Sequence, residues 1–169
     1  MCFPQVIEKS KRGDQMSSGP NRINTLFAEK AEYWDLDDLQ IDYLNESITL
    51  KLLSCHKQQI KRTYIFIKEV MSFFVYQEPN VGTIRLNDRS FTDANLLSEI
   101  SYHKNGFGHI KIESLESDLK EIEKLHAKTN FYFQVNNKDS FFIEANSVQI
   151  NDERFVNLLA DSRTLKYCE

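Results

Sequence analysis

The sequence predicts an α+β domain: a mainly antiparallel β-sheet or small sandwich with one or two helices packed against it. Apolar and polar residues alternate over several segments, which is the period of a strand with one buried face. These segments follow one another without the regular strand–helix alternation of a parallel α/β fold. The 12 Phe and 7 Tyr residues also favour strands.

The chain length suggests a single domain. Its 169 residues, 41% of them hydrophobic, are enough to form one core without a metal or disulfide. We expect the globular domain at residues 21–169 and a disordered N-terminal segment at residues 1–20. Lys11-Arg12-Gly13-Asp14 can be encoded by bases that resemble a bacterial ribosome-binding site, just before Met16. Two interpretations stay open: translation begins at Met16, or residues 1–15 are a basic tail.

The N-terminal half is predicted to contain one short helix and several strands. Apolar residues near helical spacing indicate the helix at residues 23–34. Alternation on both sides of an Asn-Glu-Ser turn predicts a hairpin at residues 39–52. Residues 62–77 are rich in β-branched and aromatic side chains, and fit either two short strands or one strand bent around Lys68-Glu69. Residues 83–86 are expected to form a short strand.

The C-terminal half carries the clearest hairpin. At residues 131–150, two alternating segments flank Asn136-Asn137-Lys138-Asp139, whose residue types favour a turn. A leucine and isoleucine stripe predicts a helix at residues 115–125. Shorter helices are expected at residues 92–100 and 152–159, and a strand at residues 109–112.

Composition argues against several functional classes. The net charge is −4 with both signs interspersed, which disfavours nucleic-acid binding but leaves open a basic protein partner. No run of eighteen apolar residues would span a membrane. The three Cys residues have no metal-ligand spacing and are too few and too scattered for a disulfide framework, which favours a reducing compartment. We therefore expect a cytoplasmic protein without cofactor or metal.

Two histidines mark one candidate site for chemistry. His103 and His109 bracket Gly106-Phe107-Gly108, and two imidazoles could act as acid and base or bind a ligand. Their spacing does not match zinc-ligand patterns, and the glycines fall short of a phosphate-binding loop. The simpler interpretation is a tight turn that needs glycine backbone angles, with histidines beside it.

Acidic side chains mark the other candidate site. A cluster of carboxylates on a rigid sheet would attract a basic protein, mainly by raising the association rate. On charge alone, we select as partner-facing residues Asp35, Asp37, Asp38, Glu113 and Glu116.

The succession of strand-like segments carries a family resemblance. The segments are ITLKLL, RTYIFIKEVMSFFVYQ, GHIKIESL and FYFQVNNKDSFFIEANSVQI, within residues 39–150. In this pattern the chain resembles small Gram-positive, Bacillus-type proteins encoded beside polymorphic toxins, many of them assigned as immunity proteins. The resemblance implies that the protein blocks a cognate toxin domain by direct binding, and it carries over no functional residue.

Two functions therefore follow from the sequence. The favoured one is a non-enzymatic cytoplasmic protein-binding module, in its finer form an immunity protein that neutralises a toxin. The alternative is a small-molecule-responsive enzyme or sensor that uses His103 and His109. No catalytic residue is assigned, because the sequence contains no hydrolase motif such as GxSxG or HExxH.

Overall fold

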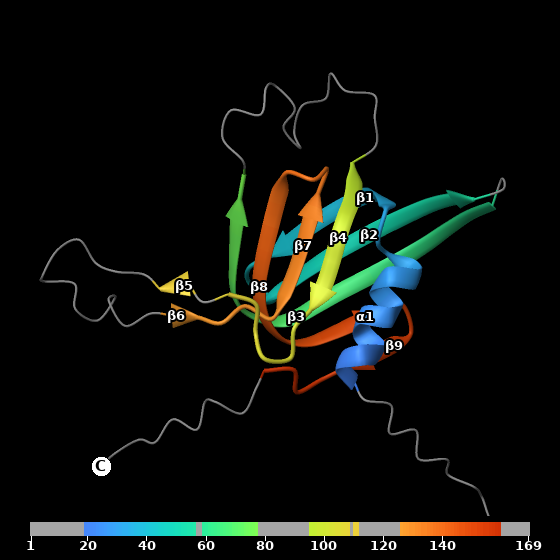
Figure 1. Ribbon diagram of the computed structural model, residues 1–169. Helices are drawn as coiled ribbons and strands as arrows, with labels where there is room; N and C mark the ends of the chain where they lie inside the picture. Colours follow the sequence, from blue (N-terminus) through green and yellow to red (C-terminus); the bar gives the residue numbers. More distant parts are fainter. Residues whose placement is uncertain (1–18, 57–58, 78–94, 109, 112–125, 160–169) are drawn as a thin grey trace, which may run out of the picture.

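A closed six-stranded antiparallel barrel forms the body of the protein, and one helix packs against it (Figure 1). The computed structural model describes residues 19–56, 59–77, 95–108, 110–111 and 126–159. In space the strands follow the order β3-β2-β1-β4-β7-β8, and a further β3–β8 pairing closes the ring. The expected α+β sheet or sandwich with packed helices is therefore wrong: the described fold is mostly β.

The barrel strands are long and continuous. Their bounds are β1 (Trp34–Asp42), β2 (Ser47–His56), β3 (Gln59–Tyr76), β4 (Leu96–Tyr102), β7 (Phe131–Val135) and β8 (Asp139–Ile150). The short strand β9 (Glu153–Phe155) pairs with the end of β8, and β5 (Ile110–Lys111) pairs with β6 (His126–Ala127) in a separate small sheet.

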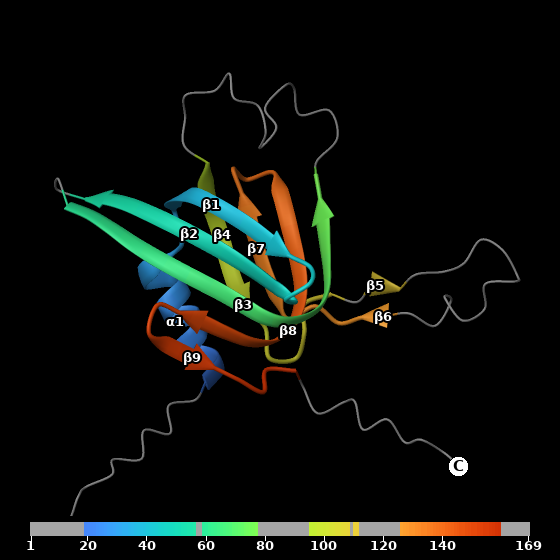
Figure 2. The same cartoon turned by 180° about the vertical axis from the view of Figure 1, so that it is seen from behind.

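Barrel closure depends on β3, which belongs to two layers. Its first half pairs with β2 from Gln59 to Lys68, and its second half pairs with β8 as far as Tyr76. Figure 2 shows β1, β2 and the first half of β3 as one layer, with β4, β7 and β8 behind it. A strand that bends from one sheet into another forms the corner of an orthogonal packing. Of the two interpretations of residues 62–77, one strand bent near Lys68-Glu69 is correct.

Alternating apolar side chains from both layers fill the interior. Every second residue of β7 is buried, as in Phe131, Phe133 and Val135, and their partners on β8 include Phe141 and Ile143. The rings of Phe133 and Phe141 stack with centroids 4.3 Å apart. The hairpin predicted at residues 131–150 is confirmed as β7–β8, and its turn places Asn136 and Asn137 at φ 54° and 55°, a left-handed conformation that Asn tolerates.

The helix α1 (Gly19–Lys30) packs against β4 and the barrel core. Its apolar residues Ile23, Leu26 and Phe27 recur at helical spacing and are fully buried. Asn24, beside them, bonds to both backbone groups of Tyr102 on β4, at 2.9 Å and 2.7 Å. The expected helix at residues 23–34 therefore exists, but it begins and ends four residues earlier.

Other predicted elements differ from the structure. Residues 96–100 of the expected helix at 92–100 belong to the strand β4, because β4 pairs with β7 over most of its length and its apolar residues Leu97, Ile100 and Tyr102 face the core. Within residues 152–159 the structure has β9 instead of a helix, joined to β8 by a two-residue turn at Asn151 (φ 50°). The hairpin at residues 39–52 is confirmed as part of β1–β2. The predicted strand at residues 83–86 and helix at 115–125 lie outside the described residues.

Candidate functional site

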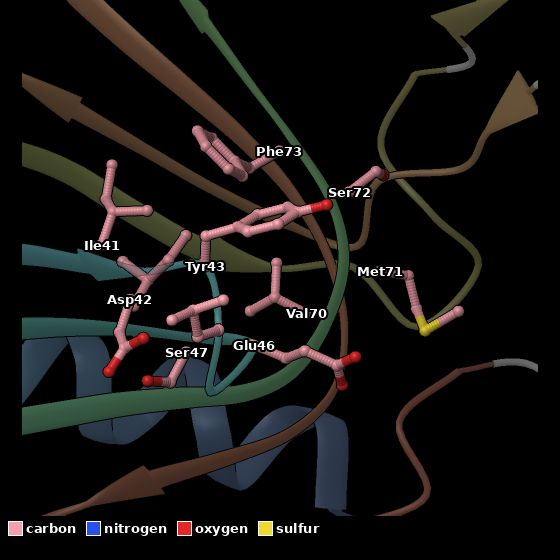
Figure 3. Close-up of a pocket in the computed structure, with 11 residues that line it drawn as sticks. Ile41, Asp42, Tyr43, Glu46, Ser47, Val70, Met71, Ser72 and Phe73 are labelled. Atoms are coloured by element: carbon pink, nitrogen blue, oxygen red, sulfur yellow. The ribbon is translucent and has the colours of Figure 1, made fainter.

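The described surface has an open cleft of about 520 Å³ between the β1–β2 hairpin and the bend of β3. One side is the tip of the β1–β2 hairpin, and the other is the bend of β3 (Figure 3). Tyr43, Val70 and Phe73 lie inside the bend, while Met71 lies on its outer side (Figure 3). The residues that line the cleft are Ile41, Asp42, Tyr43, Leu44, Glu46, Ser47, Ile48, Val70, Met71, Ser72 and Phe73.

A rigid turn presents the hairpin side of the cleft. The carboxylate of Asp42 accepts hydrogen bonds from the backbone N–H of Asn45 at 3.0 Å and from its side-chain Nδ2 at 2.6 Å. These bonds favour the ionised form and lower the pKa of Asp42. The chain turns back through Glu46 at φ 47°. In this turn Tyr43 and Leu44 stay accessible to solvent, with 81% and 90% of their surface exposed.

The β3 side of the cleft is set by Glu69. This residue adopts a left-handed conformation at φ 56°, which is uncommon for a side chain other than Gly, Asn or Asp. Its carboxylate accepts hydrogen bonds from Asn146 Nδ2 at 2.7 Å and Ser147 Oγ at 3.1 Å, both on β8. These bonds lower the pKa of Glu69 and fix the bend. The next residue, Val70, donates its N–H to Glu46 O at 3.0 Å.

Beyond Val70, the two sides of the cleft separate. The last β2–β3 pair is Ser47 with Lys68. Beyond Val70, β3 continues for six residues, of which Met71 is a bulge and Ser72 to Tyr76 pair with β8 on one edge. No described residue pairs with the other edge of this stretch. The apolar side chains along it are substantially exposed: Met71, Phe73, Val75 and Tyr76. An exposed apolar surface that borders a cleft is typical of a binding site.

The cleft carries charge of one sign. Its lining includes the carboxylates of Asp42 and Glu46 but no Lys or Arg. Three of the five selected acids, Asp35, Asp37 and Asp38, lie exposed on β1, the strand that leads to Asp42. Asp37 forms an ion pair with Lys51, which raises the pKa of Lys51. These three acids lie in the first half of β1 and do not line the cleft, which begins at Ile41 on the same strand, whereas Glu113 and Glu116 lie outside the described residues.

His103 lies elsewhere, at the end of β4. Its Nε2 is 3.0 Å from Ser101 Oγ, and its ring packs on Phe107 with centroids 4.7 Å apart. Gly106 and Gly108 have φ values of 84° and 76°, as expected for a tight turn. His109 lies outside the described residues, and within the described ranges no three His, Cys, Asp or Glu side chains are grouped to hold a metal ion.

Comparison with known proteins identifies the family. The model of the YxiG-like protein family matches residues 23–155, from α1 to the end of β9. The chain belongs to the YxiG-like family. This family is a Bacillus-type one, so the match supports the Bacillus-type part of the sequence resemblance. No curated protein and no solved structure matches the chain.

The YxiG-like region includes the whole cleft, yet its apolar residues were not selected from the sequence. Two signals were available. Tyr43 and Leu44 are apolar residues inside a turn of polar ones, and residues 70–77 contain no charge and no proline. Neither signal shows which strand edge lacks a partner.

No helix in the described part of the chain is long and apolar enough to cross a bilayer.

Proposed function

We propose that this YxiG-like protein is a non-enzymatic module that binds another protein stoichiometrically at the cleft between the β1–β2 turn and the β3 bend. The observation that carries the proposal is the exposure of large apolar side chains on a rigid support. Leu44 is 90% exposed and Tyr43 81%, although the Asp42–Asn45 bonds hold the turn in place. A surface that is already ordered loses little conformational entropy on binding, which favours affinity.

The charge around the cleft favours a basic partner. The lining has two carboxylates and no cation, and Asp35 and Asp38 extend the negative charge along β1. Such a field raises the association rate with a positively charged surface. A toxin domain that acts on nucleic acid carries such a surface, because it must bind phosphates. This fits the finer proposal of an immunity protein that neutralises a cognate toxin in the cytoplasm.

Hydrophobic contact would supply most of the affinity. Large apolar side chains at the centre of an interface usually dominate binding energy, while charges at the rim affect mainly the association rate. We therefore expect different effects from the two kinds of residue. Changes at Leu44 should raise the dissociation rate, and changes at Asp38 should lower the association rate.

The test starts from the protein encoded beside this one. The two proteins are co-expressed and purified, and their binding is measured by surface plasmon resonance. Leu44→Asp should weaken binding by about tenfold or more, an energy of about 1.4 kcal/mol. Val156→Asp is the matched control, because Val156 is exposed but does not line the cleft. Asp38→Lys should reduce the association rate several-fold at low salt and much less at high salt.

The proposal fails if the neighbouring protein does not bind, or if Leu44→Asp and Val156→Asp bind it equally well. For the immunity function, the neighbouring protein must also be toxic when expressed alone. Co-expression of the wild-type chain should then restore growth, and the Leu44→Asp variant should restore less.

A further inference from the structure

The outer edge of β3 from Met71 to Tyr76 has a hydrogen-bonding capacity that the described fold does not use. Every second residue of an antiparallel strand directs its N–H and C=O away from the paired neighbour. For this stretch the paired neighbour is β8, and no described residue pairs with the opposite edge. An exposed edge of this kind is a template for another strand.

The open edges of β1 and β3 differ in the charged residues that they carry. From Asp37 to Asp42, β1 also has an edge with no described partner, but that edge carries Asp37, Asp38 and Asp42 and a bulge next to Leu36. Charges and bulges are the usual means of preventing strand addition. β3 also has a bulge where its open edge begins, at Met71, but from Ser72 to Tyr76 its register with β8 is regular and it has no charged residue or proline. The two edges therefore differ in charge: that of β1 carries three carboxylates and that of β3 carries none.

The position of the edge connects it with the cleft. The β1–β2 turn ends beside Val70, so a strand added next to residues 71–76 would continue the line of β2 past the turn. Side chains on one face of the added strand would enter the cleft against Ile41 and Phe73. The space of about 520 Å³ accommodates several apolar side chains.

We infer that the partner binds by β-strand addition to the edge of β3 between Met71 and Tyr76, with an extended segment whose alternate residues are apolar. This inference rests on the proposed function and specifies how the partner is recognised. The segment also carries Lys or Arg where it passes Asp42 and Glu46, the two carboxylates of the lining. Backbone hydrogen bonds supply affinity, and the cleft selects the side chains.

Charge favours such a segment over a second copy of this chain. Symmetric pairing of two β3 edges would bring the Asp42 and Glu46 carboxylates of both copies to one interface, without a cation among the lining residues. Like charges placed together weaken association. A basic extended segment meets the same carboxylates favourably.

The test uses a phage-displayed library of random twelve-residue peptides, selected against the full chain. We expect enriched peptides with apolar residues at every second position and at least one Lys or Arg. The best peptide is then synthesised with a single N-methyl group at each position in turn. Because alternate N–H groups would bond to β3, methylation should weaken binding by about tenfold or more at every second position and little between them.

A protein variant tests the location of the bound peptide. Phe73→Lys should abolish peptide binding, while Val156→Lys, at an exposed residue outside the cleft, should leave it unchanged. Circular dichroism and thermal melting check that both variants are folded. The N-methyl scan changes only the peptide, so it remains informative even if Phe73→Lys is unstable.

Several results would overturn the inference: no enriched peptide, enrichment at helical spacing, or an N-methyl profile without a two-residue period. A dimer in analytical ultracentrifugation that Phe73→Lys dissociates would assign the edge to a second copy instead. The outcome is separable from that of the proposed function. If the neighbouring protein binds but no peptide competes with it, strand addition fails and the binding function stands. If a peptide binds at β3 but the neighbouring protein does not bind, the edge of β3 accepts a strand and the proposed function fails.

Discussion

The buried side chain of Asn130 gives the sharpest test of the barrel. Its Nδ2 donates to Ala145 O at 2.8 Å and to Leu158 O at 3.3 Å, and its Oδ1 accepts from Ala145 N at 3.0 Å. The last β7–β8 backbone pair joins Phe131 and Ile143, because β7 begins at Phe131. Beyond it, the side-chain amide of Asn130 replaces the backbone as the partner of Ala145 on β8. Ala145 is fully buried, so water does not replace these bonds without a change in structure.

Asn130→Ala should therefore lower the free energy of unfolding substantially. The substitution leaves the N–H and C=O of Ala145 without partners, and each unsatisfied buried group costs about 1–3 kcal/mol. We expect a total loss of about 2–5 kcal/mol, measured by urea denaturation. Asn21→Ala, at an exposed residue of α1, is the control and should change stability by about 0.5 kcal/mol or less.

Asn130→Asp adds a dependence on pH. The shape is preserved, but an ionised carboxylate accepts only and would face the C=O of Ala145. Burial raises the pKa of this introduced carboxyl in the folded protein above its unfolded value of about 4. The destabilisation relative to wild type should thus be largest at pH 7 and shrink as the pH falls through the raised pKa. A pH-independent difference, or a nearly unaffected Asn130→Ala variant, would refute the role given to this amide.

Three further predictions address the helix, the bend and the ion pair. Phe27→Ala should cost about 3–5 kcal/mol in urea denaturation, because Phe27 is fully buried where α1 meets the barrel, whereas Tyr33→Ala at an exposed residue should cost far less. Glu69→Ala should melt about 2–4 °C below Glu69→Gly, since both lose the bonds to β8 but only alanine keeps the left-handed strain; equal melting temperatures would contradict this. The Arg22 hydrogen bond lowers the pKa of Glu153, so the stability from this pair is present at neutral pH and lost as the pH falls through that lowered pKa; Glu153→Gln should be less stable at pH 7 and show a smaller loss on acidification.

The sequence was informative where structure is local. The hairpins at residues 39–52 and 131–150 were predicted because two-residue alternation and Asn-rich turns are both short-range signals. The bend at Lys68-Glu69 was also among the stated alternatives. Closure of the barrel was not predicted, since it depends on β3 pairing with both β2 and β8, which are distant in the sequence. The segment at residues 96–102 shows the same limit: its apolar spacing fits a helix as well as a strand, and contact with β7 decides between them.

Only part of the candidate site could be predicted from the sequence. Charge alone placed Asp35, Asp37 and Asp38 in the partner-facing set, and the structure locates them, exposed, on the strand whose far end lines the cleft. The apolar side chains of Tyr43, Leu44 and Phe73 were not selected, because hydrophobic residues in a β-rich chain are normally assigned to the core. Tyr43 and Leu44 are exposed because they lie in the turn between β1 and β2, whereas the exposure of Phe73 follows from the parting of two strands after Val70, a tertiary feature.

Asparagine side chains show how the fold satisfies some backbone groups that have no strand partner, and this bears on the edge of β3. At four places the side-chain amide of an Asn hydrogen-bonds to a backbone N–H or C=O. The pairs are Asn24 with Tyr102, Asn130 with Ala145, Asn136 with Leu96 and Asn151 with Tyr64. Unsatisfied backbone groups are costly, and such bonds also block the addition of a further strand. No described Asn side chain does the same for Met71–Tyr76. Amides thus satisfy unpaired backbone groups at four other positions, and carboxylates lie along the open edge of β1. The uncharged edge of β3 from Ser72 to Tyr76 has neither feature among the described residues, so it has the surface that a bound strand would need.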